Sequence, residues 1–390
     1  MDIQDTIARI HHDTRPWMAT TDPSLYVGRA GLILFDYLFQ KHGGNAAGAV
    51  DFGEAIQQLA EDSIDTTNPL FCGGAAGVRW LFTYLYKEGI LEENDWRFLC
   101  DPKEPFEETA LILLEQGNYD FLHGATGIAH YLLYAMDEGR DAFFREFLRR
   151  LYALFGKSTD GRAIPRFSYE KQVPVPGEVN LGLAHGLPSL LLFCVQCCRQ
   201  DVCAWEAEAI ARRLIAYMVD NINTDTRENF FPSIAGKGIS DKTSRLGWCY
   251  GDLGVAYSLY RAGQVFQDTR LRSLGVDILS KSTHRRTHAQ TLVNDACLCH
   301  GSAGIAHIYH RLWRDTGLPV FQTACDAWIE RTIGYATHPD GIAGYKMYDS
   351  PSEGYRNQMG FLEGPVGIGI VLLAYLTGDL GWDHCLMLNS

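Results

Sequence analysis

Seven copies of a Gly-x-x-Gly tetrapeptide, or a close variant of it, each lead directly into an apolar run of the 390-residue chain. The copies recur every 46 to 65 residues, a self-similarity that is typical of repeat architectures. Glycine allows helices to approach closely, and a helix N-terminus leaves backbone N–H groups exposed at the turn. Each copy therefore predicts a turn followed by a tightly packed helix. The seven copies are Gly28–Gly31, Gly74–Gly77, Gly124–Gly127, Gly186–Ser189, Gly251–Gly254, Gly301–Gly304 and Gly364–Gly367.

The segment between successive turns is long enough for a second helix with one polar face. The clearest example runs from Trp205 through Ile210 and Leu214 to Met218, with charged residues on its other face. One very apolar and one amphipathic helix per repeat predict an inner and an outer ring. We therefore expect an all-α fold, an α/α toroid of seven helical hairpins, formed by residues 1–390 as a single domain. An open α-solenoid is the alternative, but the restriction of potential ligands to particular turns favours the closed ring.

Three connectors are rich in proline and glycine, and their composition rules out a continuous helix. They cover residues 164–180, 231–245 and 341–358. We expect loops in these connectors, with short strands, that fold over the mouth of the ring where the seven turns converge.

The chain carries 34 basic and 47 acidic residues, which gives a formal net charge of −13. This charge disfavours nucleic acid and anionic membrane surfaces as partners, and no apolar run reaches the roughly 18 residues of a membrane span. The N-terminus has neither the basic start nor the apolar core of a signal peptide. With 11 cysteines, an odd number, these features predict reduced thiols and a cytoplasmic location without membrane insertion.

Two of the turns carry thiol and imidazole side chains, which are ligands that zinc prefers. Cys249 lies two residues before the first glycine of the fifth turn, and Cys299 with His300 has the equivalent place in the sixth. Cys249 alone would more often be a small buried apolar residue, but the equivalent pair favours a ligand. A structural zinc site normally has four protein ligands, whereas three leave a position for chemistry. We therefore predict one catalytic zinc ion with an open fourth position that holds water before substrate binds.

Other titratable residues gather in neighbouring turns and have structural alternatives. Asp120 and His123 precede the third turn, and His185 precedes the fourth. Such residues would be unusual in turns that serve packing alone, although the role of His123 stays open. Cys72 and Glu363 are further possible ligands. We expect purely structural roles for Cys297, for Cys194, Cys197, Cys198 and Cys203, and for His284, His288, His307 and His310.

The whole chain resembles the LanC family of lanthionine synthetase C-like cyclases. The resemblance rests on Trp248-Cys249-Tyr250-Gly251, Cys299-His300-Gly301, Ala184-His185-Gly186 and the seven glycine turns in order. It implies an α/α toroid with one zinc ion bound by Cys249, Cys299 and His300. It also implies that Asp120, His185, Arg245 and Tyr250 complete the active site.

The reaction implied by the resemblance is addition of a peptide cysteine to dehydroalanine or dehydrobutyrine, which closes a lanthionine or methyllanthionine ring. His185 is the expected acid that protonates the α-carbon. Asp120 would orient that imidazole or bind substrate, Arg245 would stabilise developing negative charge, and Tyr250 would donate a hydrogen bond. A purely structural Asp120–Arg245 pair is the alternative for those two residues.

Three other functions remain open at this point. A LanC-like protein of the eukaryotic type would add glutathione to dehydrated residues in proteins. A zinc prenyltransferase subunit is also an α/α toroid, although the adjacent Cys299-His300 pair argues against it. A non-catalytic peptide-binding scaffold would not need the intact set of site residues. The favoured interpretation is a stand-alone class I cyclase that acts on a dehydrated precursor peptide. A dehydratase and a transporter are the expected partners in a modification complex. Such a complex would place the protein at the membrane periphery.

Overall fold

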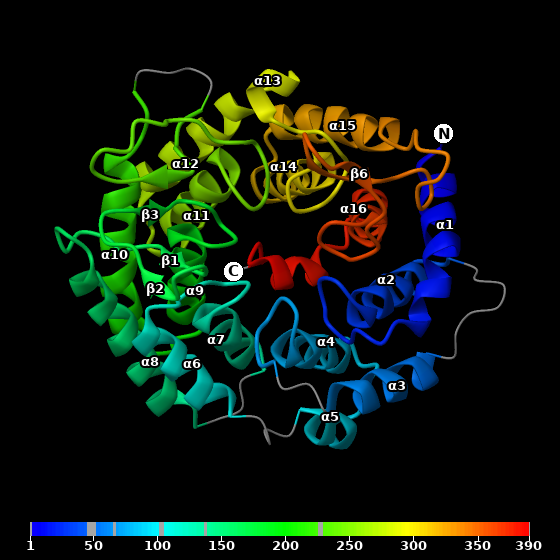
Figure 1. Ribbon diagram of the computed structural model, residues 1–390, viewed down its shortest axis with the longest axis horizontal. Helices are drawn as coiled ribbons and strands as arrows, with labels where there is room; N and C mark the ends of the chain where they lie inside the picture. The colour runs from blue at the N-terminus through cyan, green and yellow to red at the C-terminus, as the bar shows by residue number, and fades with distance from the viewer. Residues whose placement is uncertain are drawn as a thin grey trace. The chain divides into compact units, whose positions relative to one another are not determined.

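The structure is a computed structural model that describes residues 2–44, 52–64, 68–100, 105–135, 139–224 and 229–389. The chain divides into two compact units. The first unit comprises Met1–Asn68, Cys72–Cys100 and Leu292–Asp383, and the second comprises Pro69–Phe71, Asp101–Thr291 and His384–Ser390. Each unit is built mainly from α-helices (Figure 1).

An α-helix starts directly after the first glycine of every predicted turn, and that glycine is the N-cap residue in each case. Most side chains of these helices are buried, as expected from their apolar sequences. The predicted turn-to-helix transitions are therefore confirmed. The seven helices are α2 (Arg29–Lys41), α4 (Ala75–Lys87), α7 (Ala125–Tyr134), α9 (Leu187–Arg199), α11 (Asp252–Val265), α14 (Ser302–Thr316) and α16 (Pro365–Thr377).

A second set of helices lies between the glycine turns, as predicted. In α10 the apolar face buries Ile210, Leu214 and Met218. Trp205 was wrongly assigned to that face and is 80% exposed, because five residues turn it about 140° away from Ile210 at 3.6 residues per turn. The second set consists of α1 (Ile3–Thr14), η1 (Arg15–Ala19), α3 (Phe52–Ile64), α5 (Glu93–Leu99), α6 (Phe106–Gln116), α8 (Asp141–Ala153), η2 (Leu154–Lys157), α10 (Ala204–Asp220), α12 (Thr269–Ser282), α13 (His288–Thr291), α15 (Pro319–Gly334) and η3 (Gly381–Leu386).

The helices of each unit form two layers. In the first unit, α14, α16, α2 and α4 lie side by side, and α15, α1, α3 and α5 cover one side of them (Figure 1). In the second unit, α7, α9 and α11 form the corresponding layer, and α6, α8, α10 and α12 cover it. The helices that follow glycine turns are thus the more buried layer in both units, which agrees with the predicted hairpin pairing.

An Asp or Asn six residues before the first glycine shapes most of the turns, and we call this place the Asx position. The side-chain oxygen of this residue accepts a hydrogen bond from the backbone N–H of the residue two positions later in the chain. The N···O distance is 2.8 Å at Asp22, 3.3 Å at Asn118, 2.7 Å at Asn180 and 3.0 Å at Asp295. Its carbonyl accepts the first helical N–H at 2.8 Å in Asn68 and at 3.1 Å in Asn118 and Asp295. The Asx residue therefore closes the turn and satisfies an N–H group that the helix itself leaves unpaired.

One backbone hydrogen bond joins each of several pairs of neighbouring turns. In each turn it involves the residue that lies two positions before the first glycine. In the first unit, the N–H of Cys299 donates to Leu362 O at 2.9 Å, and the N–H of Leu362 donates to Tyr26 O at 3.1 Å. In the second unit, the N–H of Ala184 donates to Cys249 O at 3.2 Å. Equivalent residues of adjacent turns are thereby held in register.

The last glycine of a turn permits this close approach. A Cβ atom at Gly127 would lie 2.1 Å from the carbonyl oxygen of Phe121 and 2.6 Å from Cβ of Phe71. Gly31 is similarly close to Leu25 O, at 2.5 Å, and to Cβ of Phe361, at 2.9 Å. These distances leave no room for a side chain, which explains the recurrence of glycine at this place.

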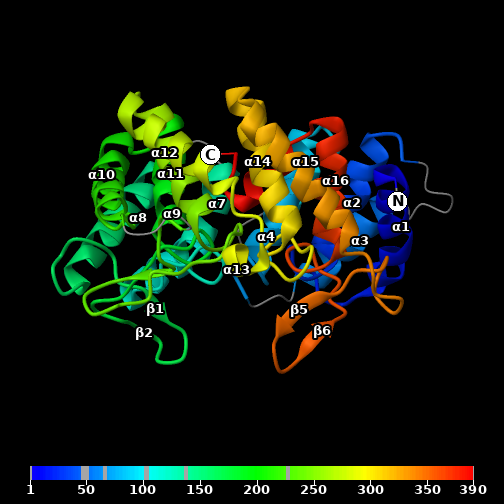
Figure 2. The ribbon, with the colours of Figure 1, turned by 90° about the horizontal axis from the view of Figure 1, so that it is seen from above.

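The proline- and glycine-rich connectors form loops with short strands, as predicted. Figure 2 shows β1 and β2 beyond one end of the second unit's helices, and β5 and β6 beyond one end of the first unit's helices. Each of the three described sheets has two antiparallel strands. The strands are β1 (Phe167–Ser168) with β2 (Val173–Pro174), β3 (Val179–Asn180) with β4 (Ile234–Ala235), and β5 (Met347–Ser350) with β6 (Gly354–Arg356). Within the described part of the chain, no helix has the length and apolar character needed to cross a membrane.

The turn packing makes a prediction for Gly127→Ala. The new methyl group would meet the Phe121 carbonyl oxygen, so we expect a loss of about 1–3 kcal/mol in stability and a lower Tm. Gly334→Ala is the matched control, because a Cβ at Gly334, the last residue of α15, meets no atom within 4 Å. That control should be neutral or slightly stabilising. Equal Tm values for the two variants in a thermal unfolding series would contradict the packing account.

Candidate functional site

The residue directly before the first glycine, which we call the pre-glycine residue, is partly exposed in every turn. Its two chain neighbours are buried in each case. A side chain at this place therefore reaches the solvent-facing end of its helix layer, and the turns that carry chemical groups there are candidates for a site. The pre-glycine residues are Val27, Gly73, His123, His185, Tyr250, His300 and Glu363.

Asp120 and His185 form a carboxylate–imidazole pair in the second unit. Oδ2 of Asp120 lies 2.7 Å from Nδ1 of His185, and the side chains are 4% and 26% exposed, respectively. Oδ1 of Asp120 accepts the backbone N–H of His123 at 2.8 Å. The carboxylate thus holds one ring nitrogen of His185, and the other nitrogen, Nε2, is left as the group that can exchange a proton with a ligand.

The pair shifts both pKa values in favour of the charged forms. Burial alone would raise the pKa of Asp120, but His185 and the His123 N–H group hold it below its ordinary value. Burial alone would lower the pKa of His185, but the Asp120 carboxylate raises it. The raised pKa extends the pH range in which His185 is protonated and can act as an acid.

His123 and Tyr169 lie beside this pair. The rings of His123 and His185 are stacked with centroids 5.8 Å apart, and Tyr169 lies edge-on to His123 at 5.9 Å. Burial lowers the pKa of His123, although the Asp120 carboxylate opposes the shift. Burial, the charge of Asp120 and a hydrogen bond to that carboxylate raise the pKa of Tyr169. The two histidines are therefore biased toward different protonation states.

Tyr250 occupies the pre-glycine place of the fifth turn. Its ring centroid lies 6.0 Å from that of His185, and its hydroxyl accepts a hydrogen bond from Nδ2 of Asn180 at 3.1 Å. Gly182 makes room for the ring, because a Cβ atom at Gly182 would lie 2.6 Å from the ring atoms of Tyr250. The structure thus brings Asp120, His185 and Tyr250 together, as predicted.

These side chains face a cavity of about 610 Å³ in the second unit. Its walls come from three glycine turns and from two of the predicted connectors, so these connectors lie over the turns as expected. Arg245 is not among the described residues that line it. The lining residues are Tyr119, Asp120, His123, Arg166, Phe167, Ser168, Tyr169, Glu170, Glu178, Asn180, His185, Ile234 and Tyr250.

Arg245 occupies the Asx position of the fifth turn, where it cannot form an Asx turn. Gly251 of that turn has φ +94°, and a Cβ there would lie 1.8 Å from the Arg245 carbonyl oxygen, so the turn has a different backbone from the others. Among the described ion pairs, Asp120 is paired with His185 and not with Arg245. This pairing favours the imidazole-orienting role of Asp120 over a structural Asp120–Arg245 pair.

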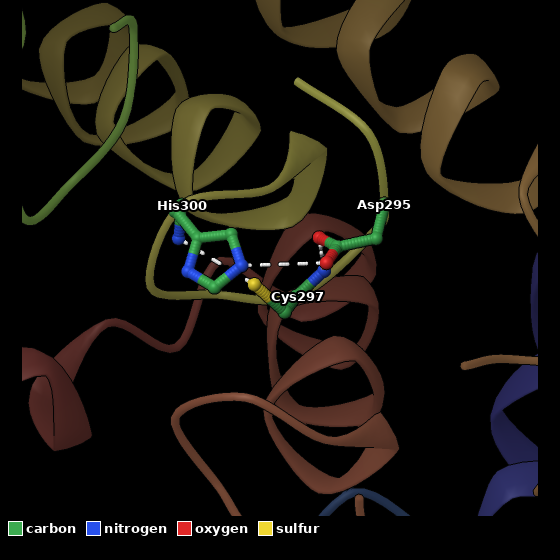
Figure 3. A group of neighbouring side chains, drawn as sticks. All are labelled: Asp295, Cys297 and His300. Carbon is green, nitrogen blue, oxygen red and sulfur yellow. Dashed lines mark hydrogen bonds and ion pairs between the residues drawn. The ribbon is translucent and has the colours of Figure 1, made fainter. Parts of the chain in front are cut away.

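Potential metal ligands gather in the first unit around His300. Ligand atoms of Cys299, His300 and Glu363 all lie within 4.8 Å of one another, and those of Asp295, Cys297 and His300 form a second such group. Figure 3 shows Asp295 and Cys297 on the same side of the His300 ring. Thiolate, imidazole and carboxylate are all zinc ligands, so the chemistry of these residues fits that metal.

The environment of His300 is strongly polar although the residue is largely buried. Oδ2 of Asp295 lies 3.4 Å from Nε2 of His300, and the backbone N–H of His300 donates to Sγ of Cys297 at 3.5 Å. Burial would lower the pKa of His300, but Cys297 and Asp295 outweigh it and raise the pKa. Cys297 is 2% exposed, as expected of a core residue, but it also contacts a predicted ligand.

The predicted ligand Cys249 belongs to the second unit and is 6% exposed. Its carbonyl oxygen accepts the N–H of Ala184, which places Cys249 in the turn adjacent to His185. Cys249 therefore has the same place in the fifth turn, two residues before the first glycine, that Cys299 has in the sixth.

The cysteines and histidines that we expected to be structural differ in their exposure to solvent. Cys194 and Cys197 are buried, whereas Cys198 and Cys203 are partly exposed free thiols. His307 is buried against Asp383, with Nε2 and Oδ2 3.0 Å apart. His310 is 2% exposed, and the exposed His284 lies outside the cavity lining.

Sequence reasoning missed several residues of this region. Tyr169 and Arg166 come from a connector without any periodic pattern, so no sequence signal placed them beside Asp120. Asn180 and Asp295 could have been found from their recurrent place six residues before a glycine. That spacing identifies the Asx position but does not identify which Asx residue also contacts a site side chain.

Comparisons with known proteins agree with this architecture. The sequence profile of the family described as "Lanthionine synthetase C-like protein" matches residues 19–387. Among solved structures, nisin cyclase is similar with a TM-score of 0.75 and 18% sequence identity, and the match covers 99% of this chain and 96% of that chain. Among curated proteins, no sequence matches the chain. The likeness confirms the predicted α/α toroid fold, and the extent of the profile match shows that the chain belongs to the lanthionine synthetase C-like family.

Proposed function

We propose that this chain is a zinc-dependent lanthipeptide cyclase. It would add cysteine thiols of a dehydrated precursor peptide to dehydroalanine or dehydrobutyrine and so form thioether rings. The observation that carries this proposal is the Asp120–His185 pair, a fixed proton donor that faces a cavity beside Tyr250. Family membership and the structural likeness to nisin cyclase support the same function.

The proposed metal ligands are Cys249, Cys299 and His300. When bound, zinc would lower the pKa of a substrate thiol and orient its sulfur. The ligand atoms of Cys299 and His300 lie within 4.8 Å of each other and of Glu363, which supports a metal at this place. Two thiolates and one imidazole form a donor set that zinc prefers and that leaves a position for substrate.

His185 would supply the proton that completes the addition. The sulfur forms a bond to the β-carbon, the electron pair of the C=C bond moves toward the α-carbon, and Nε2 of the protonated His185 delivers a proton there. The Asp120 carboxylate is hydrogen-bonded to Nδ1 of the ring, so the proton that can be transferred is the one on Nε2. Neutral His185 then takes up a proton equivalent to the one that the thiol released, so the net change is addition of S–H across the double bond.

Tyr250 and Arg245 would assist the charged intermediate. Tyr250 lines the cavity, and its hydroxyl can donate a hydrogen bond while accepting one from Asn180. We propose that Arg245 stabilises the negative charge that develops on the carbonyl oxygen of the dehydro residue. Its place in the fifth turn, where other turns have an Asx residue, supports a role other than turn formation.

We also propose the broader setting of this activity. Residues 1–390 would act as one LanC-like domain in the cytoplasm, with a dehydrated precursor peptide as substrate. A dehydratase and a transporter would associate with it in a modification complex at the membrane periphery. The family assignment supports this setting.

The cyclase activity is tested with synthetic peptides that contain one dehydroalanine and one cysteine. Cyclisation leaves the mass unchanged but removes the thiol, so the product resists a thiol-alkylating reagent in mass spectrometry. We expect His185→Asn to retain zinc and to slow cyclisation by about 100-fold or more, the usual range for loss of a general acid. His284→Asn, an exposed histidine outside the cavity, is the control and should keep the full rate.

Three results would contradict the proposed function or the proposed role of His185. A normal rate in His185→Asn would remove that residue as the acid. Full alkylation in the presence of the unmodified, zinc-loaded protein would contradict the cyclase function. A mass gain of one glutathione on a dehydroalanine peptide that lacks cysteine, without any cyclisation, would identify a glutathione-adding enzyme instead.

The Asp120–His185 pair predicts the pH dependence of the reaction. Because Asp120 raises the pKa of His185, the acid form persists to higher pH than in an ordinary histidine, and activity should fall as pH rises through that raised pKa. In Asp120→Asn, burial would dominate and lower the pKa, so the alkaline limb of the kcat/KM profile should move to lower pH. We expect a loss of about tenfold or more at neutral pH. An alkaline limb at the same pH in both proteins would contradict the pairing.

A further inference from the structure

The Asx position of the sixth turn holds a buried carboxylate. Asp295 is 1% exposed, and its Oδ1 accepts the backbone N–H of Cys297 at 3.0 Å, as an Asx turn requires. Its Oδ2 accepts the backbone N–H of Tyr348 at 2.8 Å and lies 3.4 Å from Nε2 of His300 (Figure 3). This carboxylate therefore joins the sixth turn to β5 and also contacts a predicted metal ligand.

The turn itself does not require a negative charge. The third and fourth turns form the same Asx interaction with the neutral side chains of Asn118 and Asn180. Asp22 provides a carboxylate in the first turn, but that residue is exposed to solvent and its turn has Val27 in place of an imidazole. Burial of a carboxylate is costly unless partners compensate it, so the charge of Asp295 calls for a role beyond turn formation.

We propose that Asp295 is a positioning residue that fixes the ring orientation and tautomer of His300 for metal binding. A carboxylate next to Nε2 keeps the N–H proton on that nitrogen, which leaves Nδ1 as the ring nitrogen available to bind the metal. Ligand histidines commonly donate their second N–H to such a carboxylate, which raises the basicity of the ligand. The inference rests on the proposed zinc site and assigns a residue that supports it.

The backbone of His300 is held as well. Its N–H group donates to Sγ of Cys297 at 3.5 Å, and the adjacent Cys299 N–H donates to Leu362 O at 2.9 Å. Asp295 restricts the orientation of the His300 ring, while these two hydrogen bonds restrict the main chain of Cys299 and His300. Together they would leave the His300 side chain little freedom to reorient.

Asp295→Asn tests this role with little change to the turn. The amide oxygen can still accept the Cys297 N–H, as Asn118 and Asn180 do in their turns, but an amide NH₂ group replaces the second carboxylate oxygen. Asp22→Asn is the matched control, with the same substitution at the same position of a turn without a ligand. Zinc affinity is measured for the full chain by competition with a chromophoric chelator, alongside the Tm of the zinc-free forms.

We expect Asp295→Asn to bind zinc about 10- to 100-fold more weakly than the unmodified chain, and Asp22→Asn to bind it equally well. Equal zinc affinity in the unmodified chain and both variants would overturn the inference while the zinc site itself stands. Failure of the unmodified chain to bind zinc would overturn the zinc site and this inference together.

A second measurement needs no variant and therefore remains decisive if Asp295→Asn fails to fold. Nitrogen-15 NMR of the zinc-loaded chain with labelled histidine reports which ring nitrogen carries a proton. The inference predicts that His300 has a protonated Nε2 and a metal-bound Nδ1. A metal-bound Nε2 with a protonated Nδ1 would overturn it.

Discussion

A single backbone hydrogen bond between equivalent residues of neighbouring turns determines where the chemical groups of this protein lie. It joins Cys299 to Leu362 in the first unit and Ala184 to Cys249 in the second. These bonds hold each turn in register with its neighbour in the same unit. Side chains at the same distance before the first glycine therefore lie at matching places in neighbouring turns. The last glycines permit the required approach, because a Cβ atom at Gly127 or Gly31 would lie too close to a backbone carbonyl oxygen of the preceding turn residues.

Two buried carboxylates in these turns, Asp120 and Asp295, contact histidines in different ways. Asp120 comes from the third turn and reaches His185 in the fourth, where it raises the pKa of an imidazole that lines a cavity. Asp295 lies in the same turn as His300 and faces the ring nitrogen that, in our proposal, does not bind metal. In both cases a carboxylate that accepts N–H groups offsets its own burial and selects which nitrogen of a histidine is available.

Much of this arrangement follows from local sequence. The seven glycine turns, their helices and the residues before each first glycine were predictable because each feature recurs at a fixed spacing. Tyr169 was not predictable, because it lies in an irregular connector whose path depends on tertiary packing. Trp205 was assigned to the wrong face because apolar character alone does not fix a residue's angle around a helix. The proximity of Glu363 to Cys299 depends on pairing between two turns, which a single sequence does not display.

The central claim is that Cys249, Cys299 and His300 hold one zinc ion with a position left for substrate. X-ray absorption at the zinc edge of the purified, zinc-loaded chain tests it most directly. The account predicts two sulfur neighbours at about 2.3 Å and nitrogen or oxygen neighbours at about 2.0–2.1 Å, with a third sulfur added when a cysteine-containing peptide binds. A shell without sulfur, or a four-ligand protein shell that does not change with the peptide, would contradict it.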